Sequence, residues 1–237
     1  MISLPQDTQV EAYDFPLGFF DERDWPIDRP VPDPVRIHEA AEVIRAAERP
    51  AIIAGGGVHY ADADDELREF AHALGIPVTE TFGGRGVFAD GSRLDLGSVG
   101  VDGTTPSNAV VGSADVVIAV GTRLGDFVTG SRSIFRPDAR FVALNVTRLD
   151  AYKEHAVAVV GDARTSLPAL REALGPYSTD EAYRTEIEGL VAEWRHAVAG
   201  FLAWDGERPM SQADAISVVN ATAPPESTLT AAAGTMA

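Results

Sequence analysis

The sequence contains no cysteine, and it has far fewer basic than acidic residues. The absence of cysteine excludes disulfides, thiolate metal sites and a cysteine nucleophile. The 19 Lys and Arg residues against 36 Asp and Glu residues give a net charge of -17 at pH 7. Because nucleic acids and anionic membranes attract basic surfaces, we expect neither as a partner.

Long hydrophobic runs and export signals are also missing. No apolar run reaches the length of a membrane span. The first residues, Met-Ile-Ser-Leu-Pro-Gln-Asp, have neither the charged nor the apolar region of a signal peptide. The five histidines lack metal-ligand spacing, and no Gly-x-Ser-x-Gly motif occurs, so we predict no metal site and no catalytic serine. We expect a cytoplasmic protein.

The stretch Asp115–Gly130 shows most clearly the pattern that much of the rest of the sequence repeats. Its five apolar residues, Val116–Val120, run without alternation, which is typical of a parallel strand buried on both faces. Gly121, Thr122 and Arg123 follow the strand. Ligands of open α/β sheets bind beyond the carboxyl ends of strands, so this turn is a candidate binding site. The plainer interpretation is that any βα connection needs a glycine-containing turn.

The neighbouring segments repeat this pattern. Asp33-Pro34 predicts a capped helix that ends at Pro50, and Gly75 predicts the end of a second helix. Further buried strands are expected at 51–54, 78–81, 141–145 and 156–160, and Asp162 is expected to cap a helix that Pro168 kinks or delays. The glycine-rich stretch 82–102 is expected to be a long functional or partner-bound loop. Residues 34–175 therefore predict an α/β fold, a doubly wound, Rossmann-like parallel sheet.

The two flanks differ from this unit. Residues 1–33 are rich in proline and aromatic residues, which predicts a linker that lies against a protein surface. That surface can belong to a domain outside this chain. Residues 176–210 predict a helical connection with an amphipathic helix over 181–203. Residues 211–237 predict a helix over 211–221 and the start of a strand over 228–232. Because a single strand cannot bury itself, we expect this last stretch to open a further domain that has been cut away.

A series of turns in order carries a resemblance to a known family. It consists of Ala54–Gly57 after the first strand, Gly97–Gly100 before a helix, Ala114–Leu124, and Val160–Ala163. Over about residues 34–174 the chain resembles the central domain of thiamine-diphosphate-dependent enzymes of the acetolactate-synthase-like superfamily. Outside that range, Ser3–Asp7 and Glu11–Pro16 resemble the segment that leaves the pyrimidine-binding domain of the trihydroxycyclohexanedione hydrolases, members of this superfamily that open a ring by C–C cleavage in myo-inositol catabolism. Ser211–Ala237 resembles the entrance to their diphosphate-binding domain.

The resemblance implies that the domains of such an enzyme have different roles. In such enzymes a preceding domain activates thiamine diphosphate, and a following domain holds its diphosphate and Mg²⁺ through a Gly-Asp-Gly motif. No Gly-Asp-Gly occurs in this sequence. We therefore expect a middle piece without catalytic residues, inactive alone, whose partners are the missing flanking domains and further copies of itself.

Some members of the superfamily bind FAD at matching turns. Gly55, Gly56 and Gly57 stand where a dinucleotide-binding turn would, with backbone N–H groups free to face phosphate. Gly121, Thr122, Arg123 and Asn145 complete the candidate cofactor-binding residues, and Arg123 with Arg132 could clamp an anion. Tyr60 replaces the last glycine of the Gly-x-Gly-x-x-Gly pattern, and Asn145 and Thr147 replace the acidic residues of FAD-binding members. FAD is therefore doubtful. The plainer interpretation is that the glycines are needed for packing and that the arginines form surface ion pairs.

Two other functions remain open. The first is a stand-alone FAD- or NAD-type nucleotide-binding domain of the sirtuin or deoxyhypusine-synthase kind, suggested by the three glycines. The second is a structural, oligomer-forming module, suggested by the glycine-rich loop and the aromatic N-terminal stretch. The central domain of another acetolactate-synthase-like enzyme is a further alternative.

Overall fold

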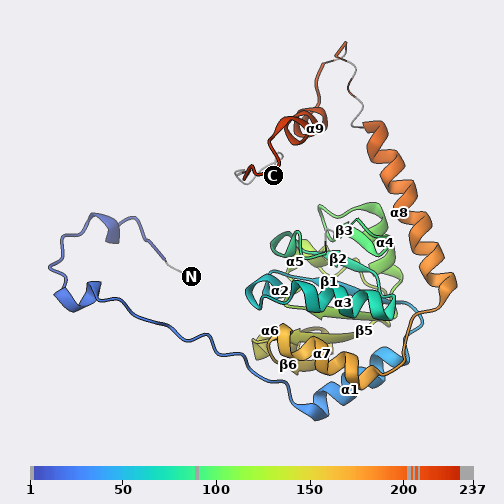
Figure 1. The fold of residues 1–237 in the computed structure, drawn as a ribbon, viewed down its shortest axis with the longest axis horizontal. Helices are drawn as coiled ribbons and strands as arrows, with labels where there is room; N and C mark the ends of the chain where they lie inside the picture. Colours follow the sequence, from blue (N-terminus) through green and yellow to red (C-terminus); the bar gives the residue numbers. More distant parts are fainter. Residues whose placement is uncertain (1–2, 89–90, 202–203, 205, 208, 230–237) are drawn as a thin grey trace.

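The computed structural model describes residues 3–88, 91–201, 204, 206–207 and 209–229. Six parallel strands form one sheet in the order β3-β2-β1-β4-β5-β6. The strands are β1 (Pro50–Ala54), β2 (Val78–Glu80), β3 (Asp95–Ser98), β4 (Val116–Val120), β5 (Arg140–Asn145) and β6 (Val157–Val160). The predicted doubly wound α/β fold is confirmed (Figure 1).

Helices cover both faces of the sheet, which explains why its strands are apolar throughout. On one face, Val116, Ile118 and Val120 of β4 share a core with α1 (Pro34–Arg45), α3 (Asp64–Leu74) and α7 (Ala163–Leu174). On the other face, Val117 and Ala119 share a second core with α4 (Thr105–Ser113) and α8 (Glu181–Phe201). Every residue of β4 is therefore buried.

Most of the predicted helix signals act as expected. The Asp33 side chain accepts a hydrogen bond from the Val35 N–H, and that of Asp162 accepts one from the Arg164 N–H at 3.0 Å. Gly75 ends α3 in the left-handed region, at φ 66°. Two details are wrong. Helix α1 ends at Arg45, and Pro50 instead begins β1; α7 starts directly after Asp162 and continues through Pro168.

The glycine-rich stretch 82–102 contains more structure than a loop. It begins with the short 3-10 helix η3 (Phe82–Gly84) and contains β3, the edge strand. Leu94 and Leu96 are buried, and the side chain of Thr79 donates a hydrogen bond to the Gly97 carbonyl at 2.8 Å. The expectation of one long loop is therefore wrong, because β3 pairs with β2 on one side only and carries acidic and glycine residues that hide its signal.

The amino ends of the six strands form one side of the sheet, which we call the amino edge, and their carboxyl ends form the carboxyl edge. The segment after α7 covers the amino edge. Tyr183 of α8 donates a hydrogen bond to the Pro50 carbonyl at 3.1 Å, and Arg49 pairs with Glu186 at 2.6 Å. The Arg49 hydrogen bond lowers the pKa of Glu186 and raises that of Arg49 itself. Burial raises the pKa of Tyr183, and it raises the pKa of Tyr177 to about 12.

Helix α8 is buried along half its length only. Tyr183, Ile187 and Val191 belong to the second core, whereas Trp194 and Val198, later on the same stripe, are half-exposed. In Figure 1 the helix runs past the sheet toward α9 (Gln212–Thr222). Ser211 and Asp214 form a capping box at the start of α9. Residues 230–232 of the strand expected at 228–232 lie outside the described residues.

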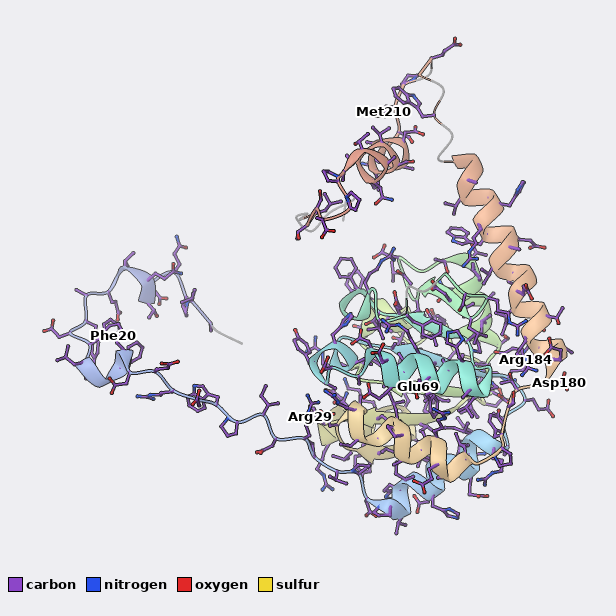
Figure 2. The ribbon with its side chains drawn as sticks, in the orientation of Figure 1. Phe20, Arg29, Glu69, Asp180, Arg184 and Met210 are labelled. Carbon is purple, nitrogen blue, oxygen red and sulfur yellow. The ribbon has the colours of Figure 1, made fainter. Side chains whose placement is uncertain are left out.

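The N-terminal stretch leads away from the sheet and contains the 3-10 helices η1 (Thr8–Val10) and η2 (Leu17–Phe20) (Figure 1). Its aromatic side chains are exposed and contact one another: Phe15 lies 5.1 Å from Tyr13 and 5.0 Å from Phe19, between ring centroids. Figure 2 shows Phe20 far from the sheet and Arg29 beside it. The stretch therefore does not lie against the surface of the described domain.

Short helices complete the carboxyl side of the sheet. They are α2 (Gly57–Tyr60), α5 (Asp126–Thr129), α6 (Arg148–Ala151) and the 3-10 helix η4 (Lys153–His155). Within the described part of the chain, every helix is too short or too polar to span a bilayer.

Candidate functional site

The predicted site residues meet at the switch point of the sheet. Strands β1 and β4 are neighbours, and the chain continues from β1 toward one edge and from β4 toward the other. The turns Gly55–Gly57 and Gly121–Arg123 therefore lie side by side, and the Gly57 N–H donates a hydrogen bond to the Gly121 carbonyl at 2.9 Å. This is the position where ligands of doubly wound sheets bind.

The glycines at this point allow three turns to touch through their backbones. A Cβ atom on Gly57 would lie 2.7 Å from the Gly121 Cα, and one on Gly56 would lie 2.6 Å from the Gly83 carbonyl oxygen. Gly121 also has a φ of 60°, a conformation that side chains rarely adopt. Backbone packing alone thus accounts for these glycines.

The backbone N–H groups expected to face a phosphate are partly occupied. The Gly55 N–H donates to the Val120 carbonyl at 2.8 Å, and the Gly57 N–H donates to Gly121. These two groups are not free, contrary to the sequence-based expectation. Helix α2, which follows the turn, has only four residues, so its dipole adds little attraction for an anion.

Thr122 and Asn145 connect the turns after β4 and β5. Asn145 is buried; its Nδ2 donates to the Thr122 carbonyl at 3.0 Å, and its Oδ1 accepts from the Thr147 N–H at 2.9 Å. Both polar ends of the amide are therefore engaged within the protein. The structure brings Asn145 to the candidate site, but as a side chain that holds two turns together.

The two arginines of the proposed anion clamp have different environments. Arg132 pairs with Glu154 at 2.6 Å, so its charge is neutralised. Arg123 is exposed, and its carbonyl accepts a hydrogen bond from Lys153 Nζ at 2.7 Å. For Arg132 the surface ion pair was the plainer interpretation, and the structure shows that pair.

Sequence reasoning missed Glu80, a buried carboxylate of this edge. Glu80 ends β2, is 3% exposed, and accepts hydrogen bonds from the N–H groups of Phe88 at 2.6 Å and Gly86 at 3.1 Å. It fixes the turn that contains Gly83 and Gly84 against the Gly55–Gly57 turn. The signal was present in the sequence as a charged residue inside an otherwise buried strand.

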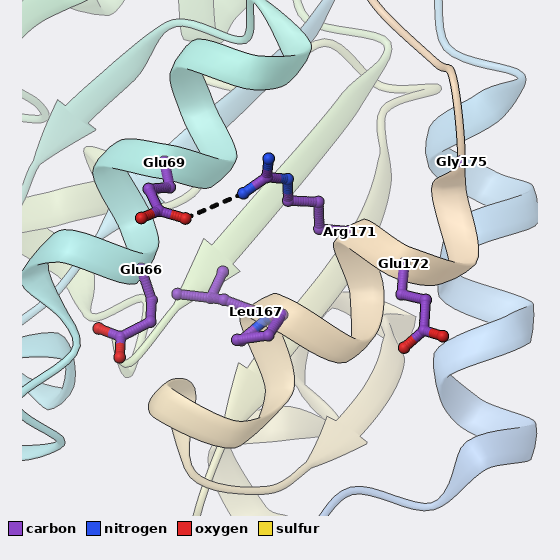
Figure 3. Close-up of a pocket in the computed structure, with 7 residues that line it drawn as sticks. Glu66, Glu69, Leu167, Arg171, Glu172 and Gly175 are labelled. Carbon is purple, nitrogen blue, oxygen red and sulfur yellow. Dashed lines mark hydrogen bonds and ion pairs between the residues drawn. The ribbon is translucent and has the colours of Figure 1, made fainter.

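A groove of about 360 Å³ lies between α3 and α7 (Figure 3). Glu66, Glu69 and Glu172 line it with Arg171, and Arg171 pairs with Glu69 at 3.0 Å. None of the predicted site residues lines this groove. Its excess of carboxylates would repel a phosphate-bearing ligand.

No group of three or more His, Asp or Glu side chains is arranged to hold a metal ion within the described residues. The exposed His59 contacts Asp64 at 2.8 Å through Nδ1 and the Arg85 carbonyl at 3.1 Å through Nε2. The site at the carboxyl edge is therefore made of packed glycines and locked polar side chains, with Arg123 facing solvent.

Comparison with curated proteins finds relatives named trihydroxycyclohexanedione hydrolases. The chain is 40% identical over 193 residues to a 3D-(3,5/4)-trihydroxycyclohexane-1,2-dione hydrolase of Geobacillus thermodenitrificans, a match that covers 81% of this chain and 30% of the relative. It is 38% identical over 195 residues to the same-named protein of Clostridium botulinum, covering 82% and 30%. A Listeria monocytogenes relative is 38% identical over 193 residues. The chain thus spans about 30% of the length of these relatives.

A family model described as "Thiamine pyrophosphate enzyme, central domain" matches residues 37–170. These residues contain all six strands and both turns of the switch point. The resemblance predicted from the series of turns is confirmed. The chain therefore belongs to the central-domain family of the thiamine pyrophosphate enzymes.

Proposed function

We propose that this chain acts as the central domain of a thiamine-diphosphate-dependent hydrolase that cleaves a C–C bond of a trihydroxycyclohexanedione in myo-inositol catabolism. The observation that carries the proposal is the identity of about 38% to hydrolases of that name, which extends beyond residues 37–170. In this proposal the chain contributes architecture and not reacting groups.

The described residues do not fit thiamine diphosphate or Mg²⁺. They contain no cluster of metal ligands, and the sequence has no Gly-Asp-Gly motif. The N–H groups of Gly55 and Gly57 are occupied by carbonyl oxygens. When bound, thiamine diphosphate supplies an electron sink for C–C cleavage next to a carbonyl. We assign its site and that of Mg²⁺ to other parts of the parent enzyme, and derive no catalytic step for this chain.

FAD stays doubtful in this proposal. Asn145 replaces an acidic residue, and both ends of its amide are engaged by Thr122 and Thr147. A nucleotide at this edge would therefore depend on side chains such as that of Arg123, because the floor beneath it is packed backbone.

We propose the following organisation: a linker over 1–33, the central domain over 34–175, a helical connection over 176–210, and the start of a diphosphate-binding domain over 211–237. Tyr183, Ile187 and Val191 support including the first half of α8 with the central domain, because they belong to its core. The missing flanking domains and further copies of the chain are the proposed partners, and the cytoplasm is the proposed location.

Two experiments test the proposal. The 237-residue chain, assayed with thiamine diphosphate, Mg²⁺ and the cyclic diketone, is expected to show no ring opening, while the Geobacillus enzyme serves as the positive control. Robust turnover by the chain alone would contradict the proposal.

The second experiment replaces the matching segment of the Geobacillus enzyme with residues 34–191 of this chain. We expect the chimera to bind thiamine diphosphate and to retain ring-opening activity. A chimera that folds and binds the coenzyme but does not open the ring would show that the two central domains are not equivalent.

A further inference from the structure

Exposed apolar side chains gather at one edge of the sheet. Among the described residues of 34–175, the large apolar side chains that are more than a third exposed all lie at the carboxyl edge. The most exposed are Tyr60, Phe82, Phe127 and Leu149, at 75–89%, which follow β1, β2, β4 and β5. We call these four residues the apolar rim. Such a concentration of apolar surface on one face indicates an interaction site.

Arginines without acidic partners stand beside this rim. Arg85, Arg123 and Arg148 follow β2, β4 and β5 and are exposed. Within the described part of the chain, no carboxylate lies within 4.0 Å of any of them. Arg132 and Lys153, in contrast, pair with Glu154 and Asp150. The side of the rim next to β4 and β5 therefore carries unbalanced positive charge in a protein whose net charge is -17.

Two exposed carboxylates that form no ion pair within the described residues also follow strands at this edge. Asp102 follows β3, and Asp126 begins α5. Asp102 lies in the β3–β4 connection and Asp126 in the β4–β5 connection. Arg148 follows β5, and the Arg123 carbonyl accepts a hydrogen bond from Lys153, which lies between β5 and β6. An acidic partner would therefore be attracted most strongly to the surface around Arg123 and Arg148.

The N-terminal stretch has the complementary chemistry. Residues 3–28 contain seven carboxylates and one arginine. Its aromatic cluster (Tyr13, Phe15, Phe19 and Phe20) is exposed, with ring centroids of neighbours 5.0–5.4 Å apart. The stretch thus combines apolar and acidic groups, as the rim combines apolar and basic groups.

The same stretch is already attached to the carboxyl edge at its far end. Arg29 donates to the Ala61 carbonyl and contacts the Asp162 carboxylate at 3.2 Å, and the Asp162 N–H donates to the Pro30 carbonyl at 2.8 Å. Ala61 and Asp162 lie beyond the carboxyl ends of β1 and β6. Figure 2 shows Arg29 at this attachment.

The attachment leaves enough chain to cross the edge. An extended stretch of 15 residues spans about 50 Å, and six strands spaced about 4.8 Å apart make an edge about 25 Å wide. Residues 13–27 can therefore reach every part of the rim without moving Arg29.

We propose that residues 13–27 dock in cis on the carboxyl edge, with the aromatic cluster on Phe127 and Leu149 and the carboxylates facing Arg123 and Arg148. Docking would bury both apolar surfaces and bring the unbalanced charges together. This inference does not depend on the proposed function, because it concerns a contact within the chain.

Limited chymotrypsin digestion of the intact 237-residue chain tests the contact, with cleavage after Phe15, Phe19 and Phe20 followed by mass spectrometry at low salt. We expect cleavage to be about tenfold slower in the native chain than in R123E/R148E, because the charge reversal removes attraction and adds repulsion. The control R136E/R140E makes the same change of charge at the amino end of β5 and should cleave at the native rate. Thermal unfolding checks that all the variants are folded.

A charge swap sharpens the test. Adding D21R/D24R to R123E/R148E should restore most of the protection, because the attraction is rebuilt with reversed signs. Equal cleavage rates in the native chain and in R123E/R148E would overturn the proposal. Protection that increases with protein concentration would also overturn it, because it would identify a second copy as the occupant.

Discussion

The two edges of the sheet are built differently. At the amino edge, α8 is attached through polar contacts: an ion pair between Arg49 and Glu186 and a hydrogen bond from Tyr183 to a backbone carbonyl. At the carboxyl edge, glycine backbones pack against one another beneath exposed aromatic and aliphatic side chains. The amino edge is thus closed by α8, whereas the carboxyl edge is closely packed underneath but uncovered in this structure. An uncovered apolar edge is suited to binding a further segment.

The largest effect is expected from filling the glycine contact at the carboxyl edge. Gly57→Ala would place a methyl group 2.7 Å from the Gly121 Cα, where only backbone can move. We expect a loss of about 3 kcal/mol in the free energy of unfolding, measured by urea denaturation. The matched control is Gly125→Ala at the same edge, where nothing lies within 4 Å and φ is -76°; a change beyond about 0.5 kcal/mol there would contradict this account.

A second comparison uses one carboxylate from each edge. Glu80 at the carboxyl edge accepts from two backbone N–H groups while buried, and Asp115 at the amino edge accepts from those of Glu48 at 2.7 Å and Arg49 at 2.9 Å while half-exposed. We expect Glu80→Ala to cost about 3 kcal/mol and Asp115→Ala about 1 kcal/mol, since water can reach the donors left behind only at the amino edge.

Urea denaturation of both variants measures the difference. Glu80→Gln, which keeps one acceptor oxygen, should fall between the native chain and Glu80→Ala. Equal losses for the two alanine variants would show that burial does not separate the edges.

At high pH, we expect the amino edge to lose its contribution to folding stability before the carboxyl edge does. Burial raises the pKa of Tyr177 from 10.0 to about 12, so its neutral form is favoured in the folded state. Its contribution to stability is fully present below pH 10 and is lost as the pH rises from 10 to 12. The same sign applies to Tyr183, whose pKa is also raised.

Thermal unfolding between pH 8 and 12 tests this dependence. The double variant Y177F/Y183F should lose less stability over pH 10–12 than the native chain. Tyr60→Phe, a change at the carboxyl edge where Tyr60 is exposed, should follow the native profile. Identical profiles for all three proteins would contradict the assignment.

The smallest expected effect is the absence of nucleotide binding at the carboxyl edge. Two of the three glycine N–H groups are occupied, and Asn145 is locked between two turns. Isothermal titration of the chain with FAD, NAD or ADP should therefore give no binding heat up to millimolar ligand. Saturable binding that is lost in Arg123→Ala would revive the nucleotide-binding interpretation.

Much of the fold could be predicted because buried strands have apolar residues at every position and helix caps have characteristic residues. Val116–Val120 is apolar throughout since helices cover both faces of β4, and Asp33 and Asp162 are capping residues that act locally. Strand β3 could not be predicted, because an edge strand with Asp95 and Gly97 lacks the apolar run that identified its neighbours. Pairing with β2, a tertiary effect, forms it.

The candidate site was predictable in place but not in detail. Gly121 and Gly55–Gly57 follow buried strands, so their meeting at the switch point was expected. Whether a glycine N–H is free depends on which carbonyl lies opposite, and that is set by the register of β1 with β4. Glu80 was missed for a related reason: its partners, Gly86 and Phe88, are brought back to it by a turn that the sequence does not reveal.

Lys153, whose ammonium group holds the Arg123 carbonyl, is the only lysine in the sequence. Amine-reactive reagents therefore have one side-chain target, and it stands at the carboxyl edge. In a chain that also lacks cysteine, a dye on Lys153 and a second dye on an introduced thiol can be attached without cross-reaction. The protein thus offers its own reporter for whatever covers that edge.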